Sequence, residues 1–162
     1  MQLRKLKMED APLMLEWMHD KSVVSHLGTD FSKKSLEDCL GFIAASQQDE
    51  NNLHLAIADG EDTYMGTVSL KHIDRQAKNA EFAITVRACA MGKGFSGFGM
   101  DHILRMGIEK LGLTDIYWCV SPKNERAVRF YNKHNYLRVD TVPEQILCNY
   151  PEDMELIWYV YR

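Results

Sequence analysis

A strand-like run and a glycine-rich turn follow each other in the middle of the chain, and the turn has the residue types that bind phosphate. The run NAEFAITV ends at Val86, and the turn MGKGFSG spans 91–97. Apolar residues then recur at helical spacing from Met100 to Leu111. Glycines let the backbone approach a ligand, and a helix start offers free N–H groups and a positive dipole end. The dipole alone contributes only ~0.3–1 kcal/mol, so several amides and Lys93 must act together. The stretch predicts a phosphate cradle; a loop whose glycines only make a turn is the alternative.

Composition limits the class of protein. The chain has 162 residues, which is typical of one domain with a core of its own. The net charge of −4 argues against a general nucleic-acid binder. No apolar run approaches the ~20 residues that span a membrane, and the N-terminus has no apolar signal core, so we expect a cytoplasmic protein without a membrane partner.

Cysteine and histidine spacing predicts no metal site. The four cysteines are scattered without a C-x-x-C pair, which is typical of reduced thiols rather than of a zinc site or a disulfide framework. The six histidines also lack ligand spacing. A lone histidine is more often structural than metal-binding, so these residues carry no prediction of a metal.

Hydrophobic periodicity predicts early helices, strands in the middle, and alternating strands and helices at the end. Helices that follow strands favour a parallel pairing near the glycine-rich turn, because parallel strands need a crossover connection. A cofactor can enter where such a pairing splays. The expected strands are 2–6, 53–58, 63–73, 80–86, 115–120, 136–148 (with a break at Pro143 left open) and 154–161; the expected helices begin at Asp10 and Ser35 and span 97–111 and 125–134.

Three separated stretches resemble the GNAT superfamily of acetyl-CoA-dependent N-acetyltransferases. They are AEFAITV with MGKGFSG, then IEKLGLTDIYWCV, then NERAVRFYNKHNYLRV with its Asn-x-Arg-Ala…Tyr pattern. The N-terminal pattern and the IWYVYR ending look most like the branch that contains the ribosomal-protein N-terminal acetyltransferases. The resemblance implies one GNAT-like domain over 1–162 with an α+β (mixed α/β) fold. Its central sheet would be mixed but mostly antiparallel, with six to seven strands splayed at the cofactor site and helices on both faces.

The chain departs from the family pattern at three positions. The pattern begins with Gln or Arg and ends with Gly or Ala, where this chain has Met91 and Ser96. Met91 removes a polar side chain near the pyrophosphate while the amides remain, so we expect cofactor binding that is retained but weaker. Ser96 is small and can cap the following helix. Asn135 replaces a glycine after the late helix, and asparagine tolerates the left-handed conformation.

The resemblance implies a role for each matching residue and implies no metal. Backbone groups of Ile84, Thr85 and Val86 would pair with the pantetheine arm as an added strand does. Asn124 would cap the late helix and touch the cofactor arm, and Tyr131 would face the thioester sulfur. The amides that would hold the pyrophosphate belong to Gly92, Lys93, Gly94, Phe95, Ser96 and Gly97.

Amine acetylation needs a neutral amine, a stabilised oxyanion and a proton for the leaving thiolate. A lysine-like amine is neutral about once in a few thousand molecules at pH 7, which corresponds to roughly 4–5 kcal/mol. Tyr131 is the candidate acid, because a phenol pKa of ~10 suits a thiolate of pKa ~8.5; a core tyrosine is the alternative. The oxyanion donor would be a main-chain N–H of 84–86. Glu81 is the candidate base, with a solvated strand-edge acid or an ordered water as alternatives.

The acceptor is open at this stage: a protein N-terminus, an amino sugar, a polyamine or an antibiotic all fit. We expect its site in the early helices and in the 136–148 region, including Trp17, His19, His26, Asp30 and Phe31.

The function expected from the sequence is acetyl transfer from acetyl-CoA to a primary amine of a small molecule or a protein N-terminus, by direct attack in a ternary complex. The alternative is a non-catalytic CoA- or nucleotide-binding regulatory module. A dinucleotide enzyme fits less well, because its glycines would come early in the chain. We expect a monomer or homodimer: the apolar ending IWYVYR is either an interface or, as we prefer, a buried central strand.

Overall fold

One seven-stranded sheet organises the chain, and a computed structural model describes it over residues 1–162. The strand order is β1-β2-β3-β4-β5-β7-β6, and β4–β5 is the one parallel pair. This sheet confirms the expected mixed, mostly antiparallel fold. The strands are β1 (Gln2–Lys5), β2 (Leu53–Ala58), β3 (Tyr64–Asp74), β4 (Asn79–Val86), β5 (Asp115–Val120), β6 (Leu137–Val139) and β7 (Ile157–Tyr161).

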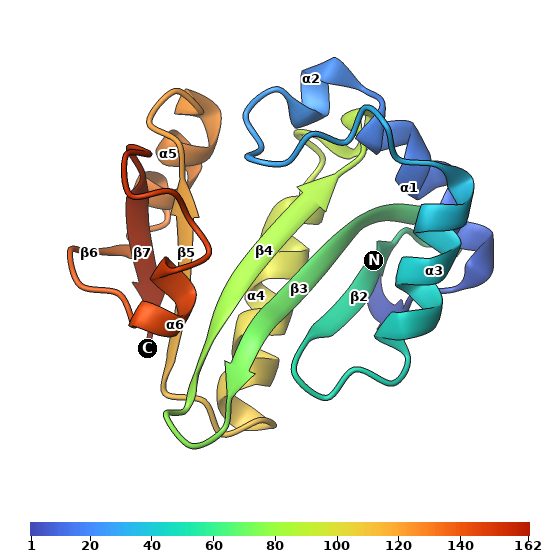
Figure 1. The fold of residues 1–162 in the computed structure, drawn as a ribbon. Coiled ribbons are helices and arrows are strands. Elements are labelled where there is room, and N and C mark those ends of the chain that lie inside the picture. Colours follow the sequence, from blue (N-terminus) through green and yellow to red (C-terminus); the bar gives the residue numbers. More distant parts are fainter.

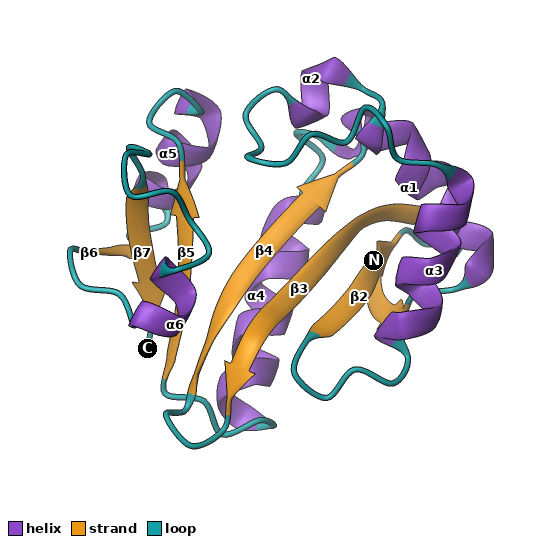
Figure 2. Cartoon of the chain, viewed as in Figure 1, coloured by secondary structure: helices purple, strands orange, loops and turns teal.

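Helices cover both faces of the sheet, as Figure 2 shows in purple. Along one face, α4 packs so closely that a Cβ at Gly107 would lie 2.7 Å from Ile116 Cδ1. The α5 residue Tyr131 belongs to the same core cluster as α4, whereas α1 and α3 enclose a second cluster on the other face. The helices are α1 (Ala11–Met18), α2 (Lys21–Val24), α3 (Leu36–Ser46), α4 (Phe95–Glu109), α5 (Glu125–Lys133) and α6 (Glu144–Leu147).

Local capping explains where two of these helices begin. The expected capping box opens α3: the Asp38 amide donates to Ser35 Oγ at 3.2 Å, and the Ser35 amide donates to Asp38 Oδ2 at 2.9 Å. Asn124 caps α5 as expected, because its Oδ1 accepts from the Ala127 amide at 3.3 Å. Asn135, just after α5, has φ of 58°, which is the left-handed conformation predicted for it.

The parallel pair β4–β5 opens along its length. The two strands pair only at Asn79–Asp115, Ala80–Ile116 and Glu81–Tyr117. Beyond Glu81 they diverge, which Figure 1 shows as a widening separation below α2 and α5. Backbone groups of β4 on that side therefore have no strand partner from Phe82 onward. The expected splay is confirmed, and it lies toward the glycine-rich turn.

The expected strand 136–148 is wrong over most of its length. Only Leu137–Val139 is a strand, and α6 follows with Pro143 at its N-cap. The carbonyl of Pro143 accepts from the amides of Ile146 and Leu147, both at 3.0 Å, which starts a helical turn. The strand expected at 154–161 begins only at Ile157.

Two further expectations meet different outcomes. Ser96 does not cap α4, because α4 already begins at Phe95 with Gly94 in the N-cap position. The ending IWYVYR forms β7, which lies between β5 and β6 with its middle residues buried, so the expected central strand is confirmed. None of the helices combines the length and the apolar composition that crossing a bilayer requires.

Candidate active site

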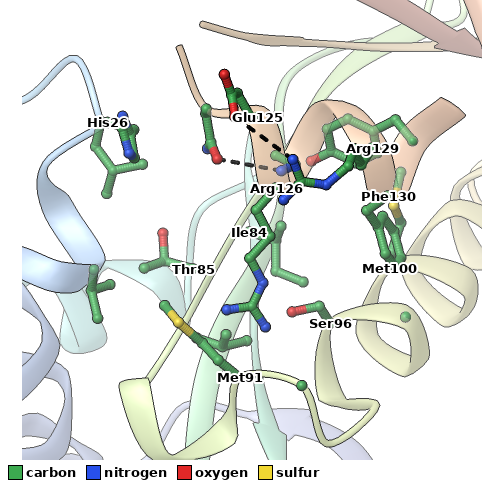
Figure 3. Close-up of a pocket in the computed structure, with 18 of the residues that line it drawn as sticks. His26, Ile84, Thr85, Met91, Ser96, Met100, Glu125, Arg126, Arg129 and Phe130 are labelled. Carbon is green, nitrogen blue, oxygen red and sulfur yellow. Dashed lines mark hydrogen bonds and ion pairs between the residues drawn. The ribbon is translucent and has the colours of Figure 1, made fainter. Parts of the chain in front are cut away.

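A cavity of about 590 Å³ opens where β4 and β5 diverge, and we call it the β4–α5 cavity. Its walls come from the end of β4, the glycine-rich turn, the start of α4, and α5, with α2 and its following residues opposite (Figure 3). Nine of the residues predicted for the site line this one cavity: Ile84, Thr85, Val86, Gly92, Gly94, Ser96, Gly97, Asn124 and Tyr131.

The glycine-rich turn needs its glycines. Gly92 has φ of +75° and Gly94 has φ of +87°, which side chains with a Cβ adopt only with strain. Gly94 is the N-cap of α4, and the first helical turn, whose amides have no partner within the helix, lines the cavity through Ser96 and Gly97. Two of the predicted side chains lie elsewhere: Lys93 is exposed and does not line the cavity, and Phe95 is buried in the core.

Arg126 faces the glycine-rich turn from α5, and the sequence analysis assigned it no role. Its guanidinium lies between Met91 and Ser96 in Figure 3. A Cβ at Gly92 would lie 3.6 Å from Arg126 Nη2. Lys123 and Arg129 also line the cavity, although Arg129 is paired with Glu125 at 3.7 Å. The cavity therefore has cationic side chains that the sequence analysis, which named only Lys93, did not predict. The signal that could have identified Arg126 is its place as the Arg of the Asn-x-Arg-Ala pattern.

Tyr131 lines the β4–α5 cavity from α5 and is only 8% exposed. Its ring packs against Trp118 at 5.6 Å and Tyr159 at 5.1 Å between centroids. Burial raises the pKa of Tyr131 well above its ordinary value, and no hydrogen bond to another protein group opposes that shift. The phenol therefore keeps its proton at neutral pH, and the same shift makes it a weaker acid toward a thiolate than an exposed tyrosine.

Glu81 lies on the other face of the sheet from Tyr131. Its strand neighbours Ala80 and Phe82 point into the core cluster that holds Tyr131, so Glu81 points away from it. The carboxylate is buried, accepts a hydrogen bond from the Tyr150 hydroxyl, and has its second oxygen without a hydrogen-bond partner. Lys71 Nζ lies 3.8 Å from that second oxygen. Glu81 lines neither of the two main cavities.

A second cavity of about 290 Å³ lies between α1, α3 and the sheet, and we call it the α1–α3 cavity. Trp17 and Phe31, both predicted for the acceptor site, line it and pack edge to face at 5.2 Å. Ile84 and Thr85 line both cavities. The β4 segment at the split therefore forms the junction between them.

The other residues predicted for the acceptor site lie elsewhere. His26 lines the β4–α5 cavity instead. The ring of His19 hydrogen-bonds to the Lys34 carbonyl at 2.8 Å, and the Asp30 carboxylate accepts from the Ser32 amide at 2.9 Å. The 136–148 region lines neither cavity.

The fold, the split between β4 and β5 and the glycine-rich turn define an acyltransferase of the GNAT type. The chain matches the acetyltransferase (GNAT) domain family over residues 1–136, so it belongs to that family. It is an N-acetyltransferase, and acetyl-CoA is the donor that the family uses.

By sequence, the chain is similar to the uncharacterized N-acetyltransferase p20 of Bacillus licheniformis. The two are 26% identical over 137 residues, which is 83% of this chain and 77% of the relative. The spermidine N(1)-acetyltransferase of Vibrio cholerae is 26% identical over 101 residues, which is 62% of this chain and 58% of that protein.

Solved structures show the same fold. The spermidine N-acetyltransferase of Vibrio cholerae in complex with CoA and spermine matches with a TM-score of 0.82 and 19% identity, over 99% of this chain and 94% of that chain. A dodecameric structure of the spermidine N-acetyltransferase from the same organism matches with a TM-score of 0.75 and 20% identity, over 99% of this chain and 92% of that chain. These similarities confirm the predicted fold class.

Proposed function

We propose that this chain moves an acetyl group from acetyl-CoA, held in the β4–α5 cavity, to a primary amine held in the α1–α3 cavity. The observation that carries the proposal is the junction at Ile84 and Thr85, which line both cavities. A donor and an acceptor bound on the two sides of this segment would meet there without leaving the protein. Direct attack within a ternary complex follows from that arrangement.

The residues present fit acetyl-CoA. Beyond Glu81, the β4 edge has free backbone groups that an extended pantetheine arm can pair with. The amides of Gly92, of Gly94 and of the first turn of α4 suit a pyrophosphate, whereas the Lys93 amide already donates to the Ala90 carbonyl at 3.4 Å. Met91 gives the turn no polar side chain, but Arg126 provides a cation from α5, on the opposite side of the same cavity. We therefore assign Arg126 to the diphosphate, in place of the Gln or Arg that the turn lacks.

The chemistry assigns one proton and one charge to this chain. The amine nitrogen bonds to the thioester carbonyl carbon, the C–S bond breaks, and CoA leaves as a thiolate that needs a proton. Tyr131 lines the cavity and keeps its proton at neutral pH, so it is the proposed donor. A free N–H of the 84–86 segment is the proposed oxyanion donor.

Glu81 stays the proposed base, but its burial means that a proton cannot reach it directly from the cavity. Its carboxylate is buried behind Lys71, which does line the α1–α3 cavity. A proton from the acceptor amine must therefore reach Glu81 through an intermediate such as an ordered water. The oxygen without a hydrogen-bond partner is the atom that would receive it.

The acceptor class has several candidates. The named relatives support a small-molecule amine, because one curated relative and both solved structures are named for spermidine. An acceptor of the protein N-terminus kind, as in the ribosomal-protein branch, stays a prediction, as do a monomeric or homodimeric state and a reaction without metal.

The deciding measurement is release of free CoA thiol on mixing the protein with acetyl-CoA and a panel of primary amines. Thiol release that depends on an amine, with stoichiometric N-acetyl product by mass spectrometry, supports the enzyme. Tight acetyl-CoA binding in calorimetry with no thiol release from any amine would instead favour the non-catalytic binding module.

A further inference from the structure

The charge of the α1–α3 cavity separates the acceptor candidates. Two lysines, Lys34 and Lys71, line it, while Asp38 is the one carboxylate among its lining residues. A polyamine carries several ammonium groups and needs several anionic partners when it leaves water. This cavity instead has two cationic side chains and one anionic side chain.

Asp38 is already engaged in the fold. Its Oδ2 accepts from the Ser35 amide at 2.9 Å and from Ser35 Oγ at 3.1 Å, which forms the capping box of α3. The backbone hydrogen bond from Ser35 is the main cause that lowers the pKa of Asp38. An ammonium group that took this carboxylate would compete with the cap.

The two lysines differ in their partners. Lys71 Nζ lies 3.8 Å from the buried Glu81 carboxylate. Lys34 is exposed, lines the cavity and forms no ion pair, although its charge helps to lower the pKa of Asp38 on the same wall. His54 also lines the cavity, and its imidazole provides no negative charge to offset those of the two lysines.

The rest of the wall combines seven apolar residues with His54 and the hydroxyl side chains of Thr29, Thr67, Ser69 and Thr85. Met14, Trp17 and Met18 come from α1, and Phe31 and Phe42 come from the loop after α2 and from α3. A volume of about 290 Å³ lies at the small end of ligand pockets, which are ~300–1,000 Å³. Such a space suits one bulky apolar side chain rather than a long extended chain.

Resting on the proposed function, we infer that the acceptor is a free α-amino acid with a large apolar side chain, such as phenylalanine, tryptophan or methionine. The side chain packs between α1 and α3, the carboxylate pairs with Lys34, and the amine lies at the Ile84–Thr85 junction. The α-amine loses a proton to the base, its nitrogen bonds to the acetyl carbon, and the products are an N-acetyl amino acid and CoA with a free thiol.

The test compares matched acceptors at one pH by thiol release. Phenylalanine, tryptophan and methionine are assayed beside phenylalaninamide, phenethylamine, spermidine and glucosamine 6-phosphate. We expect the kcat/KM of the best amino acid to exceed that of its own amide and that of spermidine about tenfold or more. The amide and spermidine have no carboxylate, so neither can form the charged pair with Lys34. A preference for spermidine, for the sugar phosphate or for the amide would overturn the inference and leave the proposed acetyl transfer standing.

Two neighbouring lysines provide matched variants. Lys34→Glu reverses the charge in the cavity, whereas Lys33→Glu makes the same change at an exposed residue that does not line it. We expect Lys34→Glu to raise the ratio of spermidine to phenylalanine turnover about tenfold, and Lys33→Glu to leave that ratio nearly unchanged. Equal effects of the two variants would show that only general surface charge matters and would refute the pairing.

A binding measurement separates the two proposals if no amine is turned over. Phenylalanine and spermidine are titrated into the CoA-loaded protein in a calorimeter. If phenylalanine binds and Lys34→Glu weakens that binding, the assigned ligand class stands although the proposed function fails. Binding of spermidine alone, or of neither ligand, refutes the ligand class as well.

Discussion

The guanidinium of Arg126 on α5 faces Gly92 in the glycine-rich turn, with Nη2 3.6 Å from the position that a Cβ on Gly92 would occupy. This relationship brings a cation to a turn whose first position is Met91 rather than Gln or Arg. It also connects two of the stretches on which the family resemblance depends. If Arg126 binds the diphosphate as proposed, it would supply from α5 the polar group that Met91 does not offer.

Arg126→Gln tests that assignment. Loss of a charge-assisted contact of ~1.5–3 kcal/mol predicts a rise of about tenfold or more in the KM for acetyl-CoA. The kcat should change little, because such a contact binds the ground state and the transition state alike. The matched control is Arg105→Gln on the outer surface of α4, where Arg105 pairs with Asp101 at 2.8 Å. A normal KM in Arg126→Gln would remove the residue from the site.

Tyr131→Phe tests the proton donor. Removing the hydroxyl should lower kcat about a hundredfold, within the range of general acid catalysis, while acetyl-CoA still binds. Tyr136→Phe is the control, because Tyr136 belongs to the same aromatic cluster, 5.1 Å from Trp118, but does not line the cavity. If both variants lose activity equally, the cluster is structural and Tyr131 has no special role in proton transfer.

Elements with strong local signals could be predicted from the sequence. The strands 53–58 and 115–120 have the predicted bounds, and α3 begins at its capping box. The strand 136–148 was wrong because its apolar residues suit either a strand or a helical turn. There, long-range contacts help hold α6 in place: the Gln145 side chain hydrogen-bonds to Asp74 and Asn79, both at 3.0 Å.

The cofactor side of the site was more predictable than the acceptor side. The glycine-rich turn and the Asn-x-Arg-Ala stretch are local patterns, and the structure brings their residues to one cavity. The α1–α3 cavity instead takes residues from five helices and strands and from a loop, so no local spacing marks Lys34 or Lys71. Arg126 was missed for a related reason, since its position opposite Gly92 depends on how α5 packs.

Glu81→Gln tests the base. The substitution keeps an oxygen for the Tyr150 hydroxyl but removes the charge beside Lys71. If Glu81 receives the amine proton, kcat should fall about a hundredfold and the pH–rate profile should change shape. Tyr150→Phe is the comparison, because it removes the hydrogen bond and leaves the carboxylate in place. An unchanged pH–rate profile in Glu81→Gln would exclude it as the base.

Cys119→Ala tests direct attack against an acetyl-cysteine intermediate. Burial raises the pKa of Cys119 to about 11, so only ~10⁻⁴ of this thiol is ionised at pH 7. A thiol that is so rarely the thiolate is a poor nucleophile. We therefore expect Cys119→Ala to keep turnover within about threefold of the parent. Initial rates at several concentrations of both substrates should give intersecting lines; parallel lines and an inactive variant would indicate a covalent intermediate.

His54 predicts how stability changes with pH. Burial is the main cause that lowers the pKa of this histidine, and the nearby Lys71 lowers it further while Asp49 opposes the shift. Its Nδ1 is 2.6 Å from Ser69 Oγ, and its ring packs on Phe42 at 4.7 Å between centroids. In the unfolded chain the imidazole takes up a proton near pH ~6.5, whereas the folded chain resists protonation until a lower pH.

The unfolded state therefore binds more protons in that window, and the free energy of unfolding should fall as the pH drops below ~6.5. Above that pH His54 is neutral in both states and contributes nothing to the slope. Melting temperatures from pH 7.5 to pH 5.0 should decline less steeply in His54→Gln than in the parent. His102→Gln, on the exposed surface of α4, controls for loss of a histidine as such. If the slopes of the parent and His54→Gln coincide, other groups determine the acid sensitivity of the fold.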